Sequence, residues 1–261
     1  MNIVVCIKQV PGTTEVKIDP ETNTLIRQGI ENIINPFDTY AIEEAVRLKE
    51  KHGGKVTVLT MGPPQADAAL KEAVSVGADE VILLSDRAFA GADTWATANT
   101  LAKAIQKIGA FDLIITGRQT IDGDTGQVGP EMSEMLNIPF IAYVSQIEEI
   151  KEGYLRVSRM IEEGHEVLET TLPAIITVAK EINIPRLPSL RGMMKSKSAA
   201  VTTWSIKELG VNDKEVGLAG SSTQVVKIFF PQRVSQAEVL TGEPAEQVEK
   251  LIGKLKEAKL I

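Results

Sequence analysis

Residues 55–84 read KVTVLTMGPPQADAALKEAVSVGADEVILL, and this stretch decides the fold. It begins with the apolar run Lys55–Thr60, turns at a Gly-Pro-Pro sequence into a helical stretch that ends near Gly77, and closes with a second apolar run, Glu80–Leu84. Strand, loop, helix and strand in this order predict two parallel strands joined by a crossover helix. We therefore expect an α/β protein.

The same alternation continues on both sides of this unit. Strands are predicted at Asn2–Val10 and Asp112–Thr116, and helices at Asp38–Lys51 and Thr94–Ile108. These elements predict an open, mostly parallel sheet flanked by helices. Residues 16–26 hold two alternating segments around a Pro/Asn turn, which predicts a β-hairpin that departs from the sheet.

The pattern changes in the C-terminal half. Tyr154–Arg159 and Val167–Thr171 predict a hairpin, and Ala174–Ala179 predicts the strand that completes the sheet. From Ile182 the pattern loosens. Within it we still predict a short helix near Ser205–Leu209, an extended piece at Val225–Phe230 and a last amphipathic helix at Pro244–Ala258. We therefore divide the chain into an α/β domain, residues 1–181, and an extended C-terminal part, residues 182–261.

Composition excludes several classes of protein. The chain has 261 residues, a net charge of −7 and 4% aromatic residues, which argues against nucleic-acid binding. No apolar run approaches the roughly 20 residues of a membrane helix. The N-terminus lacks the basic and small-residue features of a signal peptide, so we expect a cytoplasmic location.

The chain is also poor in residues that carry chemistry by themselves. It has one cysteine, Cys6, and two histidines. An internal disulfide, a CxxC pair and an iron–sulfur cluster are excluded, and a multi-histidine metal site is not expected. Cys6 lies within an apolar run and is interpreted as a small buried side chain rather than a reactive thiol. A bound cofactor would have to carry any redox chemistry.

The most informative loop is residues 117–130, GRQTIDGDTGQVGP, which follows an apolar strand and precedes a helical stretch. Its glycines let backbone amides approach a phosphate, so the loop is a candidate nucleotide cradle. The alternative is a long loop whose glycines only turn the chain. Asp122 and Asp124 would repel a phosphate unless they cap amides, bind ribose hydroxyls or face away. The GxGxxG and P-loop motifs are absent.

Residues 186–197 form a basic segment, RLPSLRGMMKSK, with leucine and methionine beside prolines. An apolar anchor surrounded by positive charge on an acidic protein suits transient docking to another protein. A plain basic linker is an equal alternative.

Across essentially its whole length the sequence resembles the β subunit of electron transfer flavoproteins. The resemblance rests on VSRMIEEGHEVL at residues 157–168, on LPAIIT at residues 172–177, on Asn35-Pro36-Phe37, on Met61-Gly62-Pro63 and on the glycine loop. It implies a fold like that of adenine-nucleotide α-hydrolases without hydrolase activity. It also implies a heterodimer in which residues 182–261 supply a partner-docking loop, anchored by Leu190, and an arm that wraps the α subunit.

The resemblance implies a set of residues around the nucleotide, with Lys8 and Arg118 as our candidates for polar contacts to a flavin or its phosphates. The implied cofactor-binding residues are Cys6, Lys8, Asn35, Pro36, Phe37, Asp38, Met61, Gly91, Asp93, Thr94, Gly117, Arg118, Gln119, Thr120, Ile121, Asp122, Gly123, Asp124, Thr125, Gly126, Gln127 and Val128.

Two subclasses of this family differ in what the pocket holds. Residues 86–94 and 117–130 look like those of the electron-bifurcating members of anaerobes, in which a second FAD accepts hydride from NADH. In these members, electrons pass through the α-subunit FAD to a flavin-dependent dehydrogenase of acyl-CoA, enoyl-CoA or lactate type. Electrons also pass to ferredoxin or flavodoxin. An aromatic residue of the single-flavin members is replaced near Gly12 or Thr13.

Two alternatives remain open. A single-flavin β subunit would hold structural AMP instead of FAD, and a stand-alone adenine-nucleotide sensor of the universal-stress type would share the topology. The long C-terminal part and the basic segment around Leu190 argue against the sensor. The sequence leaves undecided whether the chain is an enzyme; we expect an electron-carrier subunit of an NADH-dependent complex.

Overall fold

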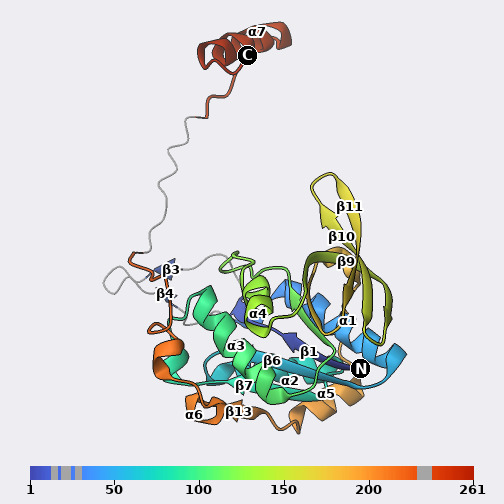
Figure 1. Ribbon diagram of the computed structural model, residues 1–261. Helices are drawn as coiled ribbons and strands as arrows, with labels where there is room; N and C mark the ends of the chain where they lie inside the picture. Colours follow the sequence, from blue (N-terminus) through green and yellow to red (C-terminus); the bar gives the residue numbers. More distant parts are fainter. Residues whose placement is uncertain (13–16, 19–24, 27–30, 228–236) are drawn as a thin grey trace. The chain divides into compact units, whose positions relative to one another are not determined.

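The computed structural model describes residues 1–12, 17–18, 25–26, 31–227 and 237–261. The chain divides into two compact units, Met1–Val225 and Val226–Ile261. The first unit contains the sheet, and the second contains one helix, α7 (Pro244–Glu257), among its described residues (Figure 1). The functional division proposed after residue 181 stays a prediction.

A nine-stranded sheet forms the centre of the first unit, in the order β11-β10-β9-β12-β8-β1-β6-β7-β13. Every neighbouring pair is parallel except β9 with β10 and β10 with β11, so the predicted mostly parallel α/β sheet is confirmed. The strands are β1 (Asn2–Cys6), β6 (Lys55–Met61), β7 (Glu80–Leu84), β8 (Leu113–Gly117), β9 (Phe140–Lys151), β10 (Tyr154–Ile161), β11 (Gly164–Thr171), β12 (Ala174–Val178) and β13 (Thr202–Trp204).

Helices cover both faces of this sheet, because successive side chains of a strand point to opposite faces. In β1, Ile3 and Val5 pack with α1 and α2, whereas Val4 and Cys6 pack with α3 and α4. The α-helices of this unit are α1 (Pro36–His52), α2 (Asp67–Val76), α3 (Thr94–Ile108), α4 (Val128–Leu136), α5 (Leu190–Lys197) and α6 (Ile206–Leu209). Short 3₁₀ turns are η1 (Pro64–Ala66), η2 (Arg87–Phe89), η3 (Lys180–Ile182) and η4 (Asp213–Glu215). Among the described residues, every helix is too short or too polar to traverse a bilayer.

The first predicted strand was too long. Instead of running from Asn2 to Val10, β1 ends at Cys6, and β2 (Gln9–Pro11) pairs with β5 (Asn32–Ile34) in a separate antiparallel sheet. The strand is interrupted because the amide of Lys8 donates to the carboxylate of Asp38 rather than to a neighbouring strand. The predicted hairpin is present: β3 (Lys17–Ile18) pairs with β4 (Leu25–Ile26), and its turn lies outside the described residues, as does Thr13.

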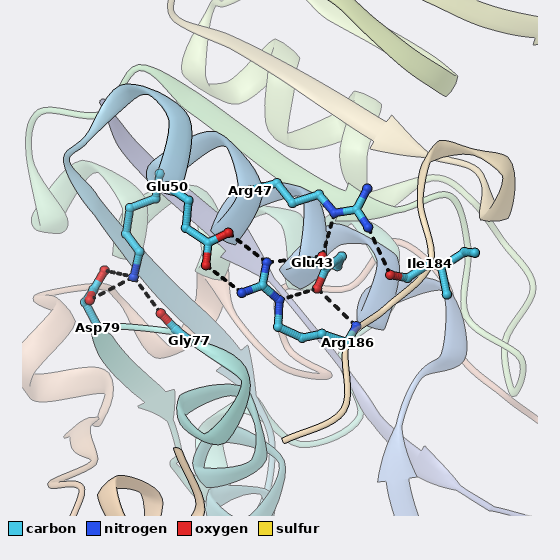
Figure 2. A network of polar contacts seen from close by, with 8 residues as sticks. Glu43, Arg47, Glu50, Gly77, Asp79, Ile184 and Arg186 are labelled. Atoms are coloured by element: carbon cyan, nitrogen blue, oxygen red, sulfur yellow. Dashed lines mark hydrogen bonds and ion pairs between the residues drawn. The ribbon is translucent and has the colours of Figure 1, made fainter. Parts of the chain in front are cut away.

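The segment before α5 is fastened to α1 by a network of ion pairs (Figure 2). The guanidinium of Arg186 donates to Glu43, at 2.8 Å from Nε, and to both carboxylate oxygens of Glu50, at 2.6 and 2.9 Å. Arg47 also donates to Glu43 and to the carbonyl oxygen of Ile184. Only 4% of the Glu43 side chain is exposed, so these contacts supply its charge partners within the protein.

The sequence analysis missed three elements of the C-terminal half: strand β9, helix α5 and strand β13. Helix α5 packs so closely on α2 that a Cβ added at Gly192 would collide with the carbonyl oxygen of Ser75. Strand β13 adds to β7 in parallel, with Thr202 opposite Ile82. Helix α5 and strand β13 are short, and their stability comes from these tertiary contacts rather than from a periodic pattern.

Candidate functional site

The site lies where four neighbouring parallel strands end. Strands β8, β1, β6 and β7 are adjacent and parallel, so the loops that follow them meet at one edge of the sheet. In open α/β sheets ligands bind at this edge. The start of α1 and the glycine loop, residues 117–127, contribute to the same edge.

Asn35 fixes the glycine loop. Its side chain is fully buried; its Nδ2 donates to the carbonyl oxygen of Gln119 at 2.9 Å, and its Oδ1 accepts from the amide of Ile121 at 3.1 Å. The backbone amide of Asn35 also donates to the carbonyl oxygen of Lys8. Asn35 was predicted to contact the nucleotide. The structure shows its side chain bonded to the glycine loop, and the nucleotide contact stays a prediction.

Lys8 neutralises an acid of the same loop. Its ammonium lies 2.8 Å from the carboxylate of Asp122. Burial acts to raise the pKa of Asp122, but the hydrogen bond and charge of Lys8 prevail and lower it. The positive charge of Lys8 therefore largely offsets the repulsion expected between Asp122 and a phosphate. The sequence analysis did not predict this pairing.

Asp38 lies beneath these groups, almost fully buried. Its carboxylate accepts from the amides of Lys8 and Gly117, at the ends of β1 and β8. Burial raises its pKa from 3.8 to about 7, although these hydrogen bonds act in the opposite direction. Burial and the charge of Asp38 raise the pKa of Cys6 to about 12, so Cys6 stays a neutral thiol, as the sequence analysis expected.

Arg118 forms no ion pair with an acidic residue in the part of the chain that the structure describes. Its guanidinium carbon lies 4.6 Å from the ring centre of Phe37, at the start of α1. Its Nε is buried and has no hydrogen-bond partner among the described residues. Buried donors are normally satisfied, so an unpaired donor at a loop edge is an unused capacity to bind an acceptor.

The remainder of the glycine loop is held by its own side chains. Gln119 donates to Asp124, and the amide of Asp124 donates to the carbonyl oxygen of Thr120 at 2.9 Å. Asp124 and Gly126 have φ angles of 52° and 62°, which turn the chain back toward α4. The side chains of Ile121, Asp124, Thr125 and Gln127 are exposed, and Gly123 lies on the same surface.

The loop after β7 joins the site through Thr94, whose hydroxyl donates to Glu131 of α4 at 3.0 Å and lies 3.2 Å from Gln127. Asp93 is engaged elsewhere: its carboxylate caps α3 at Ala96 and accepts from the amide and hydroxyl of Thr223. Gly91, with φ 74°, packs on Leu218. These two predicted cofactor residues thus contact the segment that leads out of the first unit.

Of the other predicted residues, Met61 and Val128 lie at the edge of the site, whereas Leu190 lies away from it. Met61, half-buried, ends β6 at the same edge, and Val128 begins α4. Leu190 begins α5, which packs on α2, and its side chain is 79% exposed. It takes no part in the loop cluster, and its role in docking to a partner stays a prediction.

Two residues of the site were missed. Tyr143 of β9 lies 5.9 Å from the Arg118 guanidinium, and it was missed because it is distant in sequence. Glu131 contacts Thr94 and has its pKa raised by burial and by the nearby charge of Asp93. Glu131 could have been found from the sequence, because it lies in the first turn of the helix that follows the glycine loop.

The profile of the electron transfer flavoprotein domain matches residues 22–209 of this chain, well over half its length. The chain belongs to the electron transfer flavoprotein family, as a β subunit. Electron transfer flavoprotein β subunits pair with an α subunit.

Three relatives illustrate the range of this family. The electron transfer flavoprotein subunit beta of Thermoanaerobacterium thermosaccharolyticum is 50% identical over 256 residues, covering 98% of each chain. Subunit CarD of the caffeyl-CoA reductase-Etf complex of Acetobacterium woodii is 46% identical and covers 100% of each chain. Protein FixA of Azotobacter vinelandii is 44% identical over 265 residues, covering 98% of this chain and 94% of that protein.

Proposed function

We propose that this electron transfer flavoprotein β subunit binds FAD at the carboxyl edge of its sheet and NADH transiently beside it, in the cytoplasm. When bound, FAD would supply the redox chemistry of taking a hydride from NADH and passing on its two electrons singly, one toward the α-subunit FAD and its dehydrogenase and one toward ferredoxin or flavodoxin. The chain itself binds, orients and shields the cofactor.

The observation that carries this proposal is the buried Nε of Arg118, which has no hydrogen-bond partner among the described residues. A dinucleotide brings phosphate and carbonyl oxygens, which are the acceptors that buried guanidinium donors need. The backbone of the glycine loop, fixed by Asn35 and by the Lys8–Asp122 pair, offers amides to the phosphates. The residues present therefore fit a dinucleotide.

The surface around Leu190 supports docking to a flavin-dependent dehydrogenase. Leu190 and Met194 are 79% and 74% exposed on α5, beside Arg191 and Lys195. An exposed apolar anchor with adjacent positive charge suits a transient acidic partner surface. The Acetobacterium woodii relative is named for a complex with a caffeyl-CoA reductase, which favours a partner that acts on a CoA thioester.

We assign the second unit to α-subunit binding. Val248, Leu251 and Ile252 are exposed on α7, an amphipathic helix whose apolar side chains need a covering surface. Residues 182–261 thus contribute the docking loop and the arm, and residues 1–181 the nucleotide site.

Nucleotide content tests this function. The chain is co-expressed with its α subunit, the complex is denatured, and released FAD and AMP are quantified by chromatography. Two FAD per heterodimer without AMP support the proposal; one FAD with one AMP overturns it in favour of a single-flavin carrier.

Arg118→Gln should then lower FAD content and the rate of NADH oxidation. Arg156→Gln is the control, because Arg156 lies on β10, outside the site. Unchanged flavin content and NADH oxidation in Arg118→Gln would show that Arg118 does not contact the cofactor.

A further inference from the structure

Tyr143 has a strained backbone at the edge of the candidate site. Its φ angle is 58°, in a region that side chains other than glycine and asparagine rarely adopt. It lies where the register between β9 and β12 shifts, and its amide donates to Thr177 Oγ1 at 3.1 Å instead of to the regular ladder. Such strain often marks a functional position.

The strained backbone presents an aromatic ring to the site. Tyr143 is 44% exposed. The Arg118 guanidinium carbon lies 5.9 Å from its ring centre and 4.6 Å from that of Phe37. Three planar groups from β9, the loop after β8 and the start of α1 thus lie together, although their residues are far apart in sequence.

The cluster of Arg118, Phe37 and Tyr143 has a hydrogen-bond donor without an acceptor among the described residues and an exposed ring. Arg118 forms no ion pair with any residue that the structure describes, and its buried Nε lacks an acceptor. One ring, Phe37, already covers the guanidinium, while the ring of Tyr143 remains accessible. A ring face beside unused donors suits a planar heteroaromatic ligand that carries carbonyl oxygens or negative charge.

We propose that Tyr143 stacks against the isoalloxazine ring of FAD while Arg118 donates to its carbonyl edge, so that the pair selects FAD over AMP. This inference rests on the proposed function. The isoalloxazine ring has both the planar face and the carbonyl oxygens, whereas adenine has no carbonyl oxygen. The glycine loop would hold the adenosine and phosphate portion, which FAD and AMP share, and Tyr143 would contribute nothing to AMP binding.

The test uses the complex of this chain with its α subunit, stripped of nucleotide and titrated calorimetrically with FAD and, separately, with AMP. Tyr143→Asn removes the ring and suits the positive φ, since asparagine tolerates this conformation. Tyr143→Phe keeps the ring. Tyr154→Leu is the matched control. Tyr154 also has a cation over its ring, Lys151 at 4.6 Å, but it lies on β10 outside the site.

Tyr143→Asn should weaken one of two FAD-binding events roughly tenfold or more, the usual contribution of a stacked ring, and leave the AMP affinity within about twofold. Tyr143→Phe and Tyr154→Leu should bind both nucleotides as the wild type does. Equal weakening of FAD and AMP, or unchanged FAD binding, overturns the role of Tyr143. A wild-type complex that binds AMP but no second FAD overturns the proposed function instead.

Discussion

The carboxylate of Asp38 accepts a hydrogen bond from the backbone amide of Lys8 at 2.7 Å, across 30 positions of sequence. The same carboxylate accepts from the amide of Gly117. One buried acid therefore joins the start of α1 to the ends of β1 and β8, the two strands whose following residues form the centre of the candidate site.

Asp38 should make stability depend on pH. Its pKa is raised from 3.8 to about 7, so between these values the folded protein keeps a proton that the unfolded chain releases. The contribution of Asp38 to the free energy of unfolding therefore falls as pH rises from about 4 to about 7 and is constant above that range. In Asp38→Asn this contribution is absent. Urea denaturation of the wild-type and the Asp38→Asn complexes with the α subunit, at about pH 5 and about pH 8, measures this contribution. A difference in free energy of unfolding between the two complexes that does not change with pH would contradict the prediction.

Gly117→Ala should displace the glycine loop. An added Cβ would collide with Asp38 Oδ1 and lie 2.8 Å from the backbone carbon of Phe37. We expect a loss of about 1–3 kcal/mol in the free energy of unfolding, together with lower nucleotide content. Gly123→Ala is the control for stability, because its Cβ would meet only Thr120 Oγ1 at 3.4 Å. Equal behaviour of the two variants would show that the loop accommodates the methyl group.

Lys8→Met should weaken nucleotide binding more than stability. The pair is exposed, with 47% and 33% of the Lys8 and Asp122 side chains accessible, so its loss should change the free energy of unfolding by less than about 1 kcal/mol. An unopposed Asp122 would repel the phosphates and weaken nucleotide affinity roughly fivefold at low salt. Lys55→Met breaks an equally short pair with Glu80 outside the site and should leave affinity unchanged. Calorimetric titration with the nucleotide at two salt concentrations compares the affinities of the two variants. An equal loss of nucleotide affinity in Lys8→Met and Lys55→Met would refute a local effect of Lys8.

Arg186→Met should destabilise the first unit by about 2–4 kcal/mol, because it removes partners from the buried carboxylate of Glu43. Arg186→Lys should restore little, since an ammonium cannot reproduce the forked contacts with Glu43 and Glu50 seen in Figure 2. Arg156→Met, at an exposed ion pair of β10, is the control.

The Arg186 effect should also depend on pH. Burial acts to raise the pKa of Glu43, but the hydrogen bonds from Arg186 and Arg47 prevail and lower it. The stabilisation is therefore present above the ordinary pKa of 4.5 and is lost as pH falls through the lowered value. Denaturation series of wild type and Arg186→Met should converge in acid; curves that stay parallel would place the effect elsewhere.

Much of the framework could be predicted from the sequence. The runs at Lys55–Thr60 and Glu80–Leu84 predicted neighbouring parallel strands, and the structure places them side by side as β6 and β7. The same reasoning extended the first strand past Lys8, because an apolar run does not reveal that an amide will bond to a distant carboxylate. It also missed α5 and β13, which are too short to leave a periodic signal.

The sequence by itself determined the class of fold, the family and the position of the glycine loop at a strand end, because these depend on local periodicity and on short motifs. Only the tertiary structure decided the roles within the site. Asn35 bonds the loop across 84 positions, Lys8 reaches Asp122 across 114, and Tyr143 approaches Arg118 from another strand. These contacts form when parallel strands bring their carboxyl ends to one edge, and no local pattern encodes which distant partner each side chain meets there.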